Sequence, residues 1–206
     1  MTTQVAPIVG PSAQNSRLTI QKATIKKGAL YAEFTEQLTL EAKPRPFTMQ
    51  SPELVHPDLE KCFAQLVPHF ALLTEQLYEG DYEGNYWPAP GQDLPDHFDG
   101  YGVTGIIMSS KGDGGVTLMG FRTMESGKIQ NMTAQFVSFA EQSEELEEAD
   151  VWHYKHTDEL QGAVEMALEE VELALRGKCS EVGRQLNMFE QKQLTEEVVD
   201  DLIDSK

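Results

Sequence analysis

The stretch 158–178 constrains the fold of this chain more than any other part of the sequence. Its apolar residues recur at helical spacing and line up on one side, whereas glutamates fill the other side. The members of this apolar stripe are Leu160, Ala163, Val164, Ala167, Leu168, Val171, Ala174 and Leu175. Gly177 is placed to end the helix. Such a helix is stabilised mainly by the packing of its apolar face, so the rest of the chain has to supply a surface that covers it.

Strands are predicted in two separate blocks. Residues 17–41 contain two alternating runs on either side of Lys-Lys-Gly, which predicts a β-hairpin. Residues 102–139 contain three apolar runs separated by the turns SSKGDGG and ESGK, which predicts a meander of antiparallel strands. Between the two blocks, residues 43–53 are interrupted by prolines and are predicted to form a loop.

A second helix is predicted over residues 56–77. Pro57 suits its first turn, and Pro68 should kink the helix or split it in two. The apolar residues expected on one face of it are Leu59, Cys62, Phe63, Leu66, Phe70 and Leu77.

Strands and helices are therefore segregated along the chain, which is typical of an α+β fold. We expect an antiparallel sheet of about five strands covered by two main helices. This single domain is predicted over 17–178, with a flexible N-terminal arm at 1–16 and an acidic C-terminal tail at 179–206.

The net charge of -18 is unevenly distributed. Residues 1–140 hold 10 Lys and Arg against 15 Asp and Glu, a balance of -5, whereas residues 141–206 hold 6 against 19, a balance of -13. An acidic field repels nucleic acid, and it either keeps a protein dissolved or attracts a basic protein surface. No apolar run is long enough to cross a bilayer, and the first residues do not look like a signal peptide, so a cytoplasmic protein is predicted.

The sequence gives no positive reason to assign an enzyme activity, and neither a catalytic residue nor a cofactor is predicted. His153 and His156, with Asp150 and Asp158 nearby, could bind a metal ion from one helical turn. A polar linker ahead of a helix collects such residues by chance, so no metal site is predicted. Cys62 lies on the apolar side of a predicted helix and is interpreted as a buried free thiol.

The first hairpin carries a small basic patch of Lys22, Lys26 and Lys27 beside Tyr31. Single-strand binding proteins stack bases on aromatic side chains beside a charged groove, and acidic C-terminal tails are common among them. Binding of single-stranded DNA through this hairpin is therefore one alternative hypothesis. Three lysines are a small patch, however, and Phe34 on the same hairpin can equally point into the core.

The pentapeptide Gln-Leu-Asn-Met-Phe stands in the acidic tail, after the last predicted main helix. It resembles the short peptide by which bacterial replication and repair proteins dock on the sliding clamp of DNA polymerase, whose pattern is Gln, Leu, a small polar residue, Leu, Phe. Gln185, Leu186, Asn187 and Phe189 fit that pattern, and Met188 replaces the usual Leu with a side chain of similar volume. The resemblance implies that Leu and Phe fill an apolar pocket of the clamp. The alternative is that Leu186, Met188 and Phe189 pack against the domain itself.

The layout of the chain is also similar to that of small acidic proteins of unknown function from bacteriophages and prophages. The resemblance covers about residues 18–190 and implies no established activity. The matching features are His56-Pro57-Asp58-Leu59, the strands of 102–139, Gly177-Lys178 and Met188-Phe189.

The first functional hypothesis is therefore a non-enzymatic phage-type accessory protein that docks on the host sliding clamp through Gln185–Phe189 and modulates DNA replication. The alternatives are single-strand binding and an acidic inhibitor. In the latter, the carboxylates of 141–175 imitate DNA phosphates and occupy a host DNA-binding protein, for example one of a defence system.

Overall fold

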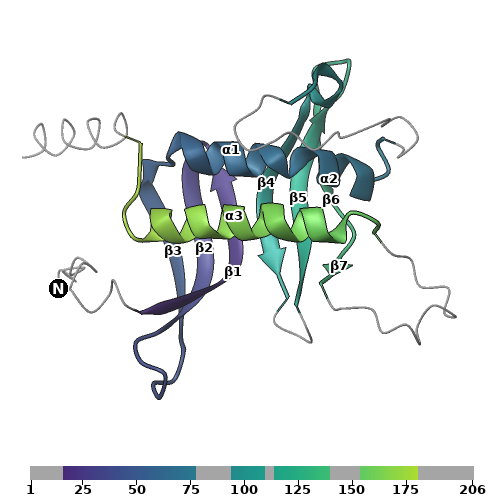
Figure 1. The fold of residues 1–206 in the computed structure, drawn as a ribbon. Helices are drawn as coiled ribbons and strands as arrows, with labels where there is room; N and C mark the ends of the chain where they lie inside the picture. Colours follow the sequence, from purple (N-terminus) through teal and green to yellow (C-terminus); the bar gives the residue numbers. More distant parts are fainter. Residues whose placement is uncertain (1–15, 78–93, 110–113, 140–153, 181–206) are drawn as a thin grey trace, which may run out of the picture.

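The computed structural model describes residues 16–77, 94–109, 114–139 and 154–180. In these ranges the chain forms two layers, an antiparallel sheet and a set of helices that covers one face of it (Figure 1). The strands are β1 (Arg17–Lys26), β2 (Ala29–Gln37), β3 (Arg45–Leu54), β4 (Tyr101–Met108), β5 (Gly115–Thr123), β6 (Ile129–Thr133) and β7 (Val137–Ser138). The helices are α1 (Pro57–Gln65), α2 (Val67–Leu73) and α3 (Thr157–Leu175), with a short 3-10 turn, η3 (Asp96–Phe98).

The sheet has the strand order β3-β2-β1-β4-β5-β6, and β7 also pairs with β5. All of its pairings are antiparallel. The predicted α+β class, with a helix-covered antiparallel sheet, is thus confirmed. The sheet contains seven strands rather than about five, because β3 and β7 add to the five that the alternating runs predict.

The first predicted hairpin is formed by β1 and β2. Lys27 and Gly28 make the turn between them, with φ angles of 52° and 76°. Two consecutive positive φ angles are the geometry of a two-residue turn that matches the twist of the strands, which explains Gly28. Lys27 adopts a positive φ that is uncommon for a residue with a side chain.

The prediction of a loop over 43–53 is wrong, because most of this segment is β3. Pro46 and Pro52 lie within the strand, and Pro46 stands opposite Thr35 of β2. The two prolines are tolerated because β3 is the outermost strand of the sheet on its side. There, a missing N–H that would point to solvent leaves no hydrogen bond between strands unmade.

Pro68 splits the second predicted helix, as expected. α1 ends at Gln65, and Leu66 joins it to α2, in which Pro68 occupies the first turn. Phe70 of α2 then reaches the sheet at Gly120 of β5. A Cβ atom on Gly120 would lie 2.8 Å from the Phe70 ring and 2.2 Å from the Gly102 carbonyl oxygen, so only glycine lets the helix come this close.

The helix predicted from the apolar stripe is α3, which lies beside α1 across the sheet (Figure 1). Five stripe residues are buried and the other three are partly buried against the core. The largest fully buried side chains of the described core include Phe63, Phe70, Phe98, Leu30, Leu59 and Leu160. Within the described ranges, every helix is too short or too polar to pass through a lipid bilayer.

Candidate functional site

The candidate docking peptide, Gln185–Phe189, lies outside the described residues, and the structure describes the point from which the chain leads toward it. α3 ends at Leu175 and Arg176 caps it. Gly177, with a φ of 105°, turns the chain out of the helix, which agrees with its predicted role. The Ser180 amide then donates a hydrogen bond of 3.1 Å to the carbonyl of Leu54, at the end of β3.

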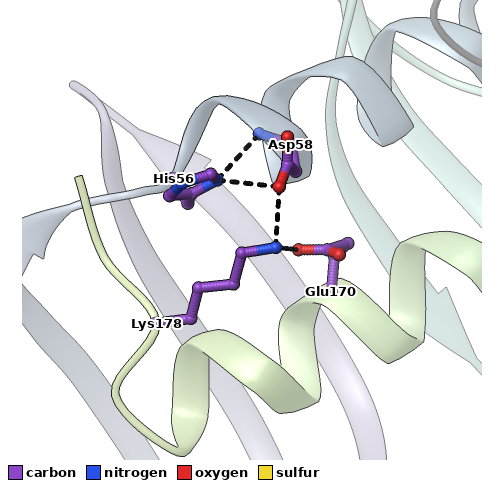
Figure 2. A network of polar contacts seen from close by, with 4 residues as sticks. All are labelled: His56, Asp58, Glu170 and Lys178. Atoms are coloured by element: carbon purple, nitrogen blue, oxygen red, sulfur yellow. Dashed lines mark hydrogen bonds and ion pairs between the residues drawn. The ribbon is translucent and has the colours of Figure 1, made fainter.

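A network of polar side chains fixes this exit point to the start of α1 (Figure 2). The Lys178 ammonium donates to Asp58 Oδ2 at 2.8 Å and to Glu170 Oε2 at 2.7 Å. His56 caps α1, because its Nδ1 accepts a hydrogen bond from the Asp58 amide. The His56 ring also lies 3.0 Å from Asp58 Oδ2. One lysine therefore connects the first turn of α1 with the last turns of α3.

Two members of the network, Asp58 and Lys178, have pKa values that favour their charged forms. The hydrogen bond from Lys178 lowers the pKa of Asp58 below its usual value. The hydrogen bonds to Asp58 and Glu170 in turn raise the pKa of Lys178 above its usual value. These side chains are partly exposed, so water and salt screen the ion pairs, and the network positions the exit point more than it stabilises the fold.

A second polar contact lies in the interior, at the other end of α3. His69 of α2 is 2% exposed, and its Nδ1 lies 2.8 Å from the hydroxyl of Tyr154, which is 7% exposed. Burial, and then repulsion from His156, lowers the pKa of His69 to about 3. The ring is therefore neutral at pH 7, and its unprotonated nitrogen can accept the tyrosine hydrogen.

Sequence reasoning missed this buried pair. Residues 140–158 are predicted from the sequence to be an acidic linker, yet Tyr154 in that segment is part of the core. The two partners are 85 residues apart, so no local pattern relates them. The available signal is an aromatic residue in a charged run just before an amphipathic helix.

The basic patch on the first hairpin is partly engaged by its own neighbours. Lys22 Nζ lies 3.5 Å from Glu33 on the adjacent strand, and Lys26 Nζ lies 5.4 Å from the centre of the Tyr31 ring. Lys27 stands in the turn. Phe34 is part of the buried core, and its ring stacks on that of Phe47, which lies on β3 and is 38% exposed. Lys22, Lys26 and Tyr31 thus already contact one another or Glu33, and single-strand binding at this hairpin stays a prediction.

Two other sequence candidates involve described residues. His156 and Asp158 flank the start of α3, whereas His153 and Asp150 lie outside the described residues. No three His, Cys, Asp or Glu side chains gather to hold a metal ion in the part of the chain that the structure describes. Cys62 is half-buried, and burial raises the pKa of its thiol, which keeps the thiol protonated at neutral pH.

A comparison of the chain with protein-family models, curated proteins and solved structures finds no match. Functional assignment therefore depends on the residues themselves.

Proposed function

We propose that this protein is a non-enzymatic accessory protein that docks on the sliding clamp of a bacterial DNA polymerase through Gln185–Phe189 and thereby modulates DNA replication. The observation that carries the proposal is the pentapeptide itself, which matches the docking pattern in order and spacing apart from Met188. The resemblance of the chain's layout to phage proteins suggests that the protein acts in the cytoplasm of an infected bacterium, where a host clamp is available.

The position of the pentapeptide supports the proposal. It begins five residues after Ser180, and the buried core of the described ranges extends only from Ala23 to Val171. The exit point at Lys178 is tied to α1, so the peptide starts from a defined place on the domain. Leu186 and Phe189 would anchor it in an apolar pocket, and the Gln185 amide would set its orientation by hydrogen bonds.

Packing of the same residues on their own domain is the competing interpretation. Leu54 is 39% exposed and Leu173 is 44% exposed. Both lie at the exit point, since Ser180 bonds to the Leu54 carbonyl and Lys178 bonds to the Leu173 carbonyl. They offer an apolar surface that could receive Leu186 or Phe189.

The deciding experiment measures binding of the full-length protein to a purified bacterial sliding clamp by calorimetry. The double substitution Leu186→Ala with Phe189→Ala should abolish binding and leave the unfolding temperature unchanged. Leu202→Ala with Ile203→Ala is the matched control, because it removes two large apolar side chains from the same tail outside the motif. Met188→Leu restores the usual residue and should tighten binding.

The outcomes separate the two interpretations. If the Leu186 and Phe189 double variant unfolds at a lower temperature than the control variant, these side chains belong to the core and the docking proposal fails. Equal loss of clamp binding in the motif variant and the control variant would also contradict it, because the pentapeptide would then have no special role.

A further inference from the structure

The inner strand β1 has an edge that its neighbour β4 leaves open. β1 pairs with β2 from Arg17 to Lys26, but it pairs with β4 only at Lys22, Ala23 and Thr24. β4 ends at Met108, and the Ser109 amide already bonds across the turn to Gly115. In Figure 1 the start of β1 bends away from β4. On this side, residues 17–21 have no strand partner within the described ranges.

A groove of about 490 Å³ lies along this open edge. Its walls are residues 17–21 of β1, Met108 and Ser109 at the end of β4, and Glu165, Leu168, Glu169 and Glu172 of α3. Consecutive residues of β1 line it, although their side chains alternate between the two faces of the sheet. The groove therefore opens on the strand edge, where alternate residues present their N–H and C=O groups.

The groove has an apolar floor and an acidic rim. Leu18, Ile20, Met108 and Leu168 are partly buried and form the apolar part. Three carboxylates and one guanidinium, that of Arg17, line it. Glu172 forms an ion pair with Arg176. Glu165 accepts a hydrogen bond from Gln161, which carries no charge. Glu165 and Glu169 therefore line the groove without an ion pair among the described residues.

We propose that this groove binds an extended peptide segment of a partner protein, which adds to β1 as a strand and places lysine or arginine side chains against α3. Alternate residues of a strand are about 6.6 Å apart. The cationic side chains on the α3 side of such a strand are long enough to reach the carboxylates that line the groove, while their aliphatic stems cover Leu168 and Met108.

Charge complementarity selects a partner protein over this chain's own segments. Residues 1–15 contain no basic side chain, and residues 181–206 contain seven acidic and three basic side chains. A second copy paired through the same edge would bring the same rim carboxylates close together, which is unfavourable. Binding at this groove is independent of the clamp motif, so the variant Leu186→Ala with Phe189→Ala should bind the peptide normally.

The test uses a dye-labelled peptide of alternating lysine and threonine and the full-length protein, with fluorescence anisotropy as the readout. We expect it to bind, more weakly as salt increases, whereas an alternating glutamate and threonine peptide should not bind. Glu165→Lys with Glu169→Lys should weaken binding by at least roughly tenfold. Glu41→Lys with Glu125→Lys is the matched control, since it changes the net charge equally at exposed sites outside the groove and should leave binding unchanged.

Strand addition is tested by methylating backbone nitrogens of the peptide. One version carries N-methyl groups at the lysines and the other at the threonines, so each blocks the donors of a different edge. One version should lose binding and the other should keep it. Equal binding of both versions would overturn strand addition, and so would failure of the unmodified peptide to bind. Equal weakening by the groove and control variants would overturn the site. If the groove variant unfolds, Glu165→Gln with Glu169→Gln replaces it.

Discussion

The two ends of α3 are held by different kinds of polar contact. Near the N-terminal end, a buried hydrogen bond joins the uncharged side chains of His69 and Tyr154. At the C-terminal end, Lys178 forms ion pairs on the surface. The distances between the bonded heavy atoms are nearly equal in the two contacts. His69 Nδ1 lies 2.8 Å from the Tyr154 hydroxyl oxygen, and Lys178 Nζ lies 2.8 Å from Asp58 Oδ2 and 2.7 Å from Glu170 Oε2. The two contacts differ in exposure to water.

That difference in exposure determines what each contact contributes. A buried polar group that loses its partner cannot turn to water, so breaking the His69 contact is costly. The groups around Lys178 regain hydration when the ion pairs break, so the loss is small. We therefore expect the N-terminal end of α3 to govern stability and its sensitivity to acid, and the C-terminal end to govern only the position of the chain exit.

Of the changes considered, acidification should lower the free energy of unfolding most, because it acts on the buried His69. Its pKa is about 3 in the fold and near 6.5 when unfolded. Above pH 6.5 the neutral ring makes its full contribution to the free energy of unfolding. That contribution is lost as pH falls from 6.5 toward 3, because in this range the unfolded chain binds a proton that the folded chain does not. The free energy of unfolding should fall by about 1.4 kcal/mol per pH unit, or about 3 kcal/mol between pH 6.5 and about pH 4. Urea unfolding at several pH values measures this slope.

The variant His69→Asn should flatten that slope, since an amide can replace the hydrogen bond and does not titrate. His97→Asn is the matched control, because it makes the same substitution at an exposed histidine. An unchanged slope in His69→Asn would mean that other groups cause the acid sensitivity.

Tyr154→Phe should have the next largest effect. It removes the hydroxyl beside His69 Nδ1 and should lower the free energy of unfolding by about 1–3 kcal/mol, the usual result of depriving a buried polar group of a partner. Tyr31→Phe, the same change on a partly exposed ring of β2, should stay within about 0.5 kcal/mol of the parent. Equal losses in the two variants, measured by urea unfolding, would contradict the assigned role of burial.

Lys178→Met should have the smallest effect. It removes both ion pairs at the exit point, and we expect a slight fall in Tm at low salt that disappears at high salt. The pH dependence of this contribution should be flat near neutrality. Asp58 loses its charge only as pH falls through its lowered pKa, and Lys178 only as pH rises through its raised pKa. Lys43→Met, at an exposed lysine without an ion pair among the described residues, is the matched control. If Lys178→Met lowers Tm more than Tyr154→Phe does, the surface ion pairs stabilise the fold more than the buried hydrogen bond, contrary to our expectation.

The sequence predicted the parts of the fold that depend on neighbouring residues. The stripe from Leu160 to Leu175 became the buried face of α3, Lys27 and Gly28 became a tight turn, and Pro68 separated two helices. Each of these follows from side-chain periodicity or from the backbone limits of proline and glycine.

The remaining features depend on contacts that are distant along the chain. Prolines in 43–53 predicted a loop because the sequence does not show whether a strand is central or at an edge. The His69–Tyr154 pair and the open edge of β1 arise only when the sheet and helices are assembled. The docking peptide is a different case, since a five-residue motif carries its own pattern and does not require the fold.

The prolines of β3 also affect how copies of this protein can associate. Among the described residues, β3 forms one edge of the sheet and β6, together with the two-residue β7, forms the other. β3 carries Pro46 and Pro52, whereas β6 and β7 contain no proline. Fibril growth by strand pairing requires every copy to accept a neighbour on both sides, and proline obstructs one of them. Even at high concentration, joining through the outer strands should therefore stop at pairs that meet at β6.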